Sequence, residues 1–325
     1  MKPSLRPAFA LPLLLAATFA ATSIAQAQSW PARPIRFVVP FTAGGANDLM
    51  ARSAAEGAAK VLGQPVVIEN KPGAGGTLGA EVVAKSAPDG YTFLISAAGV
   101  ISNHMIKKSM PFKESDLVPV AMIALAPSII IAPPNAPYNN LREFVDASKK
   151  SPDGFNFATA GTGSTPHFVA EILRSKYGAK LQIIPYKSGN ESATAIMAGQ
   201  VQATSEASIV AVPKITGGKM KALADTWTSR ISSYPQLSTA IEQGFPDIKI
   251  AHWAGVHAPA GVAPEIMDRL AAAVDAAMKM PDIAARLKAA GIEPIGGTRA
   301  SFNQFVAEER ARLAAVVKVS GMKED

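Results

Sequence analysis

The stretch Ile35-Arg-Phe-Val-Val-Pro-Phe-Thr-Ala-Gly-Gly-Ala-Asn-Asp48 decides the fold of this chain, because a strand pattern passes through a glycine turn into a helix pattern. Ile35–Val39 is apolar and rich in β-branched residues, and residues 49–62 have the apolar spacing of a helix. A helix that begins directly after a strand aims the free N–H groups of its first turn at one place. The stretch therefore indicates a seat for an anion such as a carboxylate, although ordinary tight connections in α/β proteins share the same pattern.

The rest of the chain repeats this alternation of short apolar runs and amphipathic, helix-length segments, which predicts an α/β fold. Strands separated by helices favour largely parallel pairing. We expect strands at 35–39, 66–69, 92–95, 118–123, 128–132, 156–158, 182–185, 203–205, 222–225 and 250–256, and helices at 48–62, 77–86, 141–150, 166–177, 191–199, 208–217, 264–280, 281–290 and 299–320.

Two proline-containing segments have the features of connections between domains. Pro133-Pro-Asn-Ala-Pro137 follows one expected strand, and Ala258-Pro-Ala-Gly261 follows another. If both cross, residues 28–128 plus 254–325 form lobe one, and residues 129–253 form an inserted lobe two. The predicted architecture is two mixed sheets flanked by helices, with hinges near Pro133 and Ala258 and a central cleft.

The first 27 residues have the three regions of an export signal. Lys2 and Arg6 charge the start, Ala8–Ala21 is apolar, and Ala25-Gln-Ala27 is a small-x-small cleavage site. The apolar stretch is rich in alanine, contains prolines and is short for a span of roughly 20 apolar residues. We therefore expect cleavage after Ala27 and a periplasmic protein.

Composition excludes several classes of function. The chain has no cysteine, so it has neither disulfides nor a lipid-anchored cysteine behind the signal. Its formal net charge is +7, but the basic residues are scattered and aromatic residues are only 6% of the chain. A nucleic-acid surface needs a basic patch or a stacking platform, so we expect no nucleic-acid partner. A mild positive charge suits an anionic ligand and equally suits plain solubility.

Motifs for catalysis, metal binding and cofactors are incomplete. Gly161-Thr-Gly-Ser-Thr165 has the wrong order for a nucleophile elbow, and Gly217-Gly-Lys-Met220 fails as a phosphate loop. Gly73-Ala-Gly-Gly-Thr-Leu-Gly79 has Leu78 where a dinucleotide fingerprint needs its third glycine. The four histidines lack the spacing of a metal site. We expect no catalytic residue, no metal and no cofactor.

A second strand, turn and helix start lies at Gly161-Thr-Gly-Ser-Thr-Pro-His167. Ser164 or Thr165 can cap the following helix, and Pro166 fits its first turn. An ordinary capped helix explains this segment when it is taken alone. The two loops belong to different predicted lobes, however, so together they predict that one carboxylate is held from both sides of a cleft.

These segments resemble the periplasmic substrate-binding proteins of tripartite tricarboxylate transporters, often called the Bug family. The resemblance rests on long motifs such as Glu69-Asn-Lys-Pro-Gly-Ala-Gly-Gly76 and Pro88-Asp-Gly-Tyr-Thr92. Further matching segments run in order through the chain: Trp30–Arg36, Val39–Asp48, Gly161–His167, Pro185–Lys187, Gly199–Val201, Trp253–Gly255 and Ala258–Gly261.

The resemblance implies a two-lobed, type II-like periplasmic binding protein that traps a carboxylate and delivers it to membrane permease subunits. It implies that the two loops bind the carboxylate through backbone groups, hydroxyls and bridging waters, whereas we interpret Asn70–Gly79 as structural. The expected ligand-binding residues are Phe41, Thr42, Ala43, Gly44, Gly45, Asn47, Asp48, Ala98, Thr162, Gly163, Ser164, His167 and Glu206.

Two acidic residues in that set have alternative roles. Glu206 is aligned with an aspartate of the family, and we hypothesise that it lines the cleft and favours a ligand with an ammonium or hydroxyl donor. The alternative is a solvated or lysine-paired glutamate. Asp48 lies in the first turn of a helix, where a carboxylate complements the dipole and orients water, and we favour that role over direct ligand contact.

The sequence thus predicts a monomeric binding protein for a small organic acid, without enzymatic activity. The alternative is a sensing module that presents the bound carboxylate to a membrane sensor kinase. Residues near Ser96–Gly99 and 231–239 follow the family pattern only loosely. They leave the identity of the acid open.

Overall fold

A computed structural model describes residues 30–186 and 188–323. The predicted export signal and its cleavage site at residues 1–27 lie outside the described residues. From Pro31 onward the chain belongs to one compact unit. None of the described helices combines the length and the apolar composition that a membrane span requires.

Helices and strands alternate over most of this unit, as expected. In chain order they are β1 Ile35–Val39, α1 Ala46–Leu62, β2 Val66–Asn70, η1 Ala74–Gly76, α2 Thr77–Ala84, β3 Thr92–Ser96, α3 Ala98–Ile106, η2 Glu114–Asp116, β4 Leu117–Ala132, α4 Leu141–Lys150, β5 Phe155–Thr159, α5 Thr165–Tyr177, β6 Leu181–Pro185, α6 Gly189–Met197, β7 Ala203–Ala207, α7 Ser208–Thr216, β8 Lys221–Asp225, β9 Ala251–Pro259, α8 Pro264–Lys279, α9 Pro281–Ala289, β10 Glu293–Pro294 and α10 Arg299–Ser320.

Neighbouring strands of the sheet are hydrogen-bonded in the order β2-β1-β3-β9-β4-β7-β5-β6, with β8 and β10 also paired to β4. Pairing is parallel among β1, β2 and β3 and among β5, β6 and β7. The long strands β4 and β9 are antiparallel to every strand they pair with. The predicted mixed sheets are therefore confirmed. The parallel pairing expected from the alternation of strands and helices is limited to these two groups, because β4 and β9 add antiparallel pairs.

Strand β4 is a single strand where the sequence predicted two. It pairs with β9 from Leu117 to Pro127 and then with β7 and β8 from Ser128 onward. Proline cannot donate to a strand ladder, which is why the expected break fell before Ser128. The structure tolerates Pro127 because it lies where one set of partners ends and the next begins. The partner change thus lies five residues before the hinge expected near Pro133.

The residue expected at the second hinge lies within a strand. Ala258 is fully buried within β9, where it pairs with Val118 of β4. The connection from β8 to β9 instead occupies residues 226–250, which form turns and short loops.

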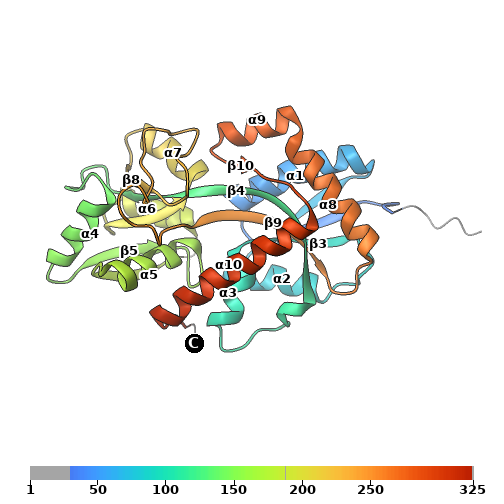
Figure 1. Cartoon of the computed structure of the whole chain (residues 1–325), viewed down its shortest axis with the longest axis horizontal. Coiled ribbons are helices and arrows are strands. Elements are labelled where there is room, and N and C mark those ends of the chain that lie inside the picture. The colour runs from blue at the N-terminus through green and yellow to red at the C-terminus, as the bar shows by residue number, and fades with distance from the viewer. Residues whose placement is uncertain (1–29, 187, 324–325) are drawn as a thin grey trace, which may run out of the picture. The chain divides into compact units, whose positions relative to one another are not determined.

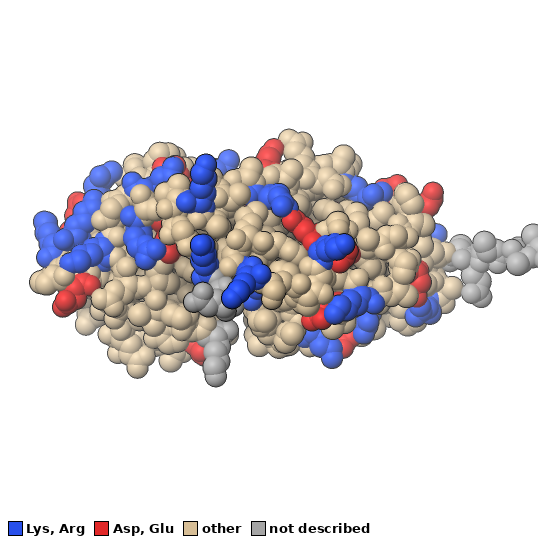
Figure 2. Space-filling model, turned by 90° about the horizontal axis from the view of Figure 1, so that it is seen from below, with Lys and Arg blue, Asp and Glu red and all other residues tan. Residues whose placement is uncertain are grey.

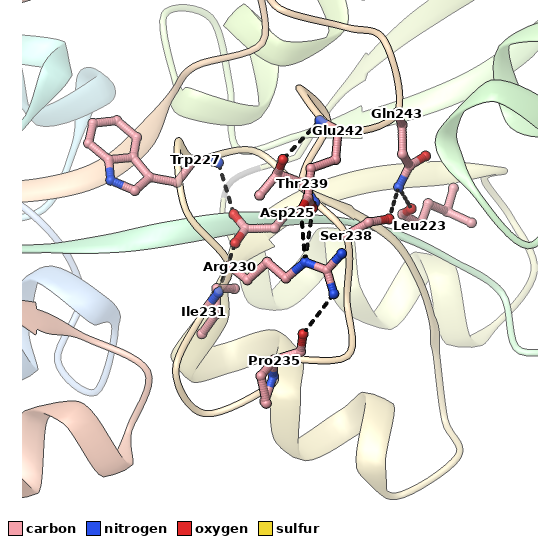
Figure 3. Close-up of polar contacts among 10 residues, drawn as sticks. All are labelled: Leu223, Asp225, Trp227, Arg230, Ile231, Pro235, Ser238, Thr239, Glu242 and Gln243. Carbon is pink, nitrogen blue, oxygen red and sulfur yellow. Dashed lines mark hydrogen bonds and ion pairs between the residues drawn. The ribbon is translucent and has the colours of Figure 1, made fainter.

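Asp225 organises this connection at the end of β8 (Figure 3). Its carboxylate accepts hydrogen bonds from the N–H groups of Trp227 at 2.8 Å and Ile231 at 3.1 Å. Burial raises the pKa of Asp225 to about 7, although both hydrogen bonds favour the ionised form. Further along, Glu242 accepts from the N–H of Thr239 and pairs with Arg230. The loop is therefore fixed by carboxylates that replace strand hydrogen bonds.

The C-terminal helix α10 packs across the rest of the chain, where it contacts β4, α3 and α5 (Figure 1). Phe302 is completely buried and lies edge-on to both Trp253 and His257 of β9. Burying an aromatic side chain in this way is among the largest stabilising contributions available to one residue. This helix therefore ties the two groups of strands together.

Helix α3 and strand β10 were not predicted. Residues 98–106 contain Gly99, Val100 and Asn103, which are poor helix formers, so propensity did not reveal the helix. Tertiary contacts compensate, because Ile101 and Ile106 are buried and Asn103 Nδ2 donates to Gly75 O and Thr77 Oγ1. Strand β10 is only two residues long and pairs with β4.

Candidate functional site

A cavity of about 540 Å³ lies where several helices begin. The starts of α1, α3, α5 and α6 all contribute to its lining, together with η1. None of the described lining residues is a lysine or an arginine, and Glu206 is the acidic residue among them. The described lining can therefore attract an anion through helix N-termini rather than through cationic side chains.

Most of the predicted site residues meet in this cavity. Those that line it are Phe41, Thr42, Gly45, Asn47, Ala98, Thr162, Gly163, Ser164 and Glu206. The structure does not place Ala43, Gly44, Asp48 and His167 in the lining. Asp48 and His167 are buried behind the two loops, whereas Ala43 and Gly44 are exposed. A role of these four residues in ligand binding stays a prediction.

The first loop enters the cavity between β1 and α1. Gly45 caps α1, and the N–H groups of Ala46, Asn47 and Asp48 in the first turn have no acceptor within the helix. Asn47 is held in place because its Nδ2 donates to Trp253 O at 2.9 Å. This end of the cavity can accept the oxygens of an anion.

Asp48 lies behind the first loop and is only 2% exposed. Its carboxylate accepts from Gly44 N at 2.9 Å, from Arg52 Nε at 2.9 Å and from Asn70 Nδ2 at 2.9 Å. Burial alone would raise the pKa of Asp48, but these hydrogen bonds and the Arg52 charge together lower it. The carboxylate is therefore ionised and already satisfied by protein donors.

The second loop lies between β5 and α5. Ser164 occupies the N-cap position of α5, but its hydroxyl donates to Gly161 O at 2.6 Å instead of capping the helix. Thr165 and His167 carry first-turn N–H groups without intrahelical acceptors, whereas Pro166 has none to offer. This loop also offers donors to an anion.

Hydrogen bonds fix both the N–H group and the carbonyl group of Gly163. Its N–H donates to His167 Nδ1 at 3.1 Å, and its carbonyl accepts from Ser102 Oγ of α3 at 3.2 Å. Its φ of 75° is in the left-handed region, and a Cβ there would lie 2.6 Å from Ile106 Cδ1. Only glycine fits at this point of the loop.

Residues from the Asn70–Gly79 segment, which was interpreted as structural, also reach the cavity. Pro72, Gly73 and η1 line it. Asn70 supports the first loop as well, because its Nδ2 donates to Phe41 O at 3.1 Å. This segment thus combines a structural contact with a position in the wall. The second role was missed because no charged residue of the segment pointed to a ligand.

The start of α6 and the end of β7 form another wall. Ser188 caps α6 by accepting from Glu191 N at 3.3 Å, and Gly189 lies against Glu206. A Cβ on Gly189 would lie 1.8 Å from Glu206 Oε2, so a larger residue would displace the carboxylate. Tyr186 and Asn190 line the same wall, and neither was predicted.

Glu206 is 7% exposed and faces the cavity. Its Oε1 accepts from the N–H of Ala207 at 2.9 Å. Burial raises the pKa of Glu206 to about 7, while the Ala207 hydrogen bond and the charge of Lys214 act in the opposite direction. Both protonation states of this carboxyl are therefore populated near neutral pH.

His252 is a lining residue that sequence reasoning missed. Burial lowers its pKa to about 4, so the ring is neutral at pH 7. Its Nε2 lies 3.5 Å from Ser128 Oγ, which in turn is hydrogen-bonded to Ser205 Oγ. The next residue, Trp253, belongs to a segment that matches the family. That segment was the one sequence signal that could have pointed to His252.

Charged side chains are distributed differently outside the cavity. Figure 2 shows Lys and Arg side chains gathered toward the end of the molecule where α4 and α5 lie. Lys149 and Lys150 occupy the last turn of α4, and Arg174 and Lys176 that of α5, where cations complement the helix dipoles.

Within residues 30–186 and 188–323, no three His, Asp or Glu side chains are grouped as metal ligands.

Comparison with known proteins gives a consistent family. The profile described as "Tripartite tricarboxylate transporter family receptor" matches residues 50–322. Protein BugT of Bordetella pertussis is 34% identical over 300 residues, which cover 91% of this chain and 92% of BugT.

Solved structures are similar over nearly the whole chain. A Rhodopseudomonas palustris protein solved with adipate is 30% identical, with a TM-score of 0.84 and coverage of 90% of this chain and 99% of that protein. MatC from Rhodopseudomonas palustris, with bound malate, is 32% identical, with a TM-score of 0.80 and coverage of 88% and 99%. The chain therefore belongs to the tripartite tricarboxylate transporter receptor family of two-lobed, periplasmic solute-binding proteins.

Proposed function

We propose that this chain captures a small organic carboxylate in the 540 Å³ cavity and delivers it to the membrane permease subunits of a tripartite tricarboxylate transporter. One observation carries the proposal: four helices begin at a cavity whose described lining has no cationic side chain. Such an arrangement favours an anion through backbone N–H groups. The adipate and malate bound by two relatives belong to the same chemical class.

The proposal includes the route by which the protein reaches its ligand. Residues 1–27 direct export and are removed after Ala27, so that the chain acts in the periplasm. Residues 28–128 plus 254–325 form one lobe and residues 129–253 the other. The partner change of β4 at Ser128 supports this division, and closure of the lobes encloses the acid.

The seat for the carboxylate lies between the starts of α1 and α5. Thr42, Asn47, Thr162 and Ser164 surround it with side-chain oxygen and nitrogen atoms, and the first-turn N–H groups supply further donors. Each helix start adds a modest favourable interaction.

In this proposal Glu206 contacts the end of the ligand that lies away from the carboxylate seat. A carboxylate at 7% exposure is costly unless a donor satisfies it, so the preferred acid carries a hydroxyl, an ammonium or a protonated group at that end.

The test combines native mass spectrometry of the purified protein with a thermal-shift panel of mono-, di- and tricarboxylates and amino acids. A ligand at a hundredfold excess over its Kd should add about 2.7 kcal/mol of stability. Glu206→Gln should change the order of preference among acids that differ in their far group. A panel in which no carboxylate stabilises the wild type would contradict the proposed function.

A further inference from the structure

Both ligand loops are braced from behind by a side chain with the same spacing. In the first loop, Gly44 N–H donates to Asp48, four residues later. In the second loop, Gly163 N–H donates to His167, also four residues later. Both acceptors occupy the first turn of the helix that follows the loop, α1 or α5.

The braces extend one helical turn further. Arg52, four residues beyond Asp48, donates to its carboxylate through Nε at 2.9 Å and through a terminal nitrogen at 3.1 Å. Glu171, four residues beyond His167, has its Oε1 3.6 Å from His167 Nε2 and accepts from Arg174 at 2.9 Å. In each case the residue that accepts from the loop is itself contacted by a side chain one turn further along the helix. Arg52 contacts Asp48, and Glu171 lies beside His167.

The geometry of the second brace fixes the tautomer of His167. Because Gly163 donates to Nδ1, that nitrogen carries a lone pair, and the proton of the neutral ring lies on Nε2. Nε2 faces the Glu171 carboxylate, which is 3% exposed and favours a proton on that side. His167 itself is 9% exposed and lies outside the cavity lining.

We propose that His167 is a positioning residue, the counterpart of Asp48, which shapes the carboxylate seat without touching the ligand. It holds Gly163 in the turn that presents Thr162, Ser164 and the first N–H groups of α5 to the cavity. Ser102 of α3 holds the other side of the same glycine. The inference rests on the proposed function, because the seat is the part of the cavity that it shapes. Preorganisation of this kind lowers the cost of binding.

Three variants separate positioning from simple packing. His167→Asn retains an acceptor close to the position of Nδ1, whereas His167→Leu fills similar space without one. His104→Leu is the matched control, because His104 packs edge-on against Phe112 rather than against either loop. Isothermal titration with malate and with adipate measures binding, and urea unfolding measures the stability of each variant.

We expect His167→Leu to weaken binding of the preferred acid by about tenfold or more, and His167→Asn and His104→Leu to remain within about threefold of the wild type. Unchanged binding by His167→Leu would overturn the proposal. So would an equal loss in His167→Asn.

A ligand-free measurement tests the brace separately from the proposed function. Nitrogen-15 NMR of the imidazole should show an unprotonated Nδ1 and a protonated Nε2. The Gly163 amide should exchange slowly in the wild type and in His167→Asn, and faster in His167→Leu. A proton on Nδ1, or equal exchange in all three proteins, would overturn the brace. If neither acid binds the wild type, the acid that the thermal-shift panel identifies replaces them in the titration. A panel without any binding acid counts against the proposed function, and the NMR result still decides the brace.

Discussion

At the residue scale, two buried carboxylates show how burial and hydrogen bonding set opposite behaviour. Asp48 receives donors from Gly44, Arg52 and Asn70, which lower its pKa despite burial. Glu206 accepts a hydrogen bond from the N–H of Ala207, and burial raises its pKa to about 7. The first carboxylate therefore supports the loop, while the second is available to the ligand. The sequence predicted the helix-start position of Asp48 but not its three partners, which come from separate elements.

Asp48→Asn should lower the free energy of unfolding by about 2 kcal/mol at pH 7, because hydrogen bonds to a charged group are lost. A carboxylate whose folded pKa lies below its ordinary value of 3.8 stabilises the fold above that pH and loses this contribution as pH falls through the folded pKa. The difference between wild type and variant should therefore shrink below about pH 4.

Urea unfolding followed by circular dichroism between pH 3 and pH 7 measures that difference. Glu56→Gln on the exposed face of α1 is the control, because Glu56 makes exposed ion pairs of small value. A constant difference across the whole pH range would show that the charge of Asp48 contributes nothing.

At the element scale, strand-turn-helix units were the part of the structure that the sequence predicted well. Both ligand loops, 40–48 and 161–167, lie where a strand pattern stops and a helix pattern begins, and their local signals sufficed. Helix α3 was missed because contacts with Gly75 and Thr77, far away in sequence, stabilise a segment of low propensity. His252 was missed for the same reason, since its place in the wall depends on the pairing of β9 with β4.

Phe302→Ala should reduce the stability of the fold by about 3–5 kcal/mol, because it removes a fully buried ring from the contact of α10 with β9. Phe305→Ala, one turn along and only partly buried, should cost less. The midpoint of urea unfolding for each variant checks the order. Equal midpoints for Phe302→Ala and the wild type would show that α10 does not anchor the strands.

At the scale of the whole molecule, the order and direction of the strands depend on pairing between segments far apart in sequence, which local patterns do not predict. Strands β4 and β9 pair antiparallel over Leu117–Pro127, and β4 then continues to β7 and β8. A strand break was expected before Ser128, but β4 continues through Pro127. A proline is tolerated there because the pairing partner of β4 changes at that point. Two lobes were predicted from the two proline-containing segments, and the family resemblance implied the same fold.

Ligand binding should draw the two proposed lobes together. Small-angle X-ray scattering of the wild type should give a smaller radius of gyration with a saturating acid than without it, because donors at α1 and α5 share one carboxylate. Identical scattering curves, with binding verified by titration of the same sample, would contradict closure. A non-binding acid from the same panel controls for effects of the added solute.

The cavity whose described lining lacks cationic side chains has a consequence for how this protein can change. A seat built from main-chain N–H groups depends on backbone conformation and survives most side-chain substitutions around it. Substitutions at walls such as Tyr186, Asn190 and Glu206 can then alter which acid fits, while the preference for a negative charge persists. The architecture separates the generic part of recognition from the variable part, so new ligand preferences can arise by few mutations and without rebuilding the site.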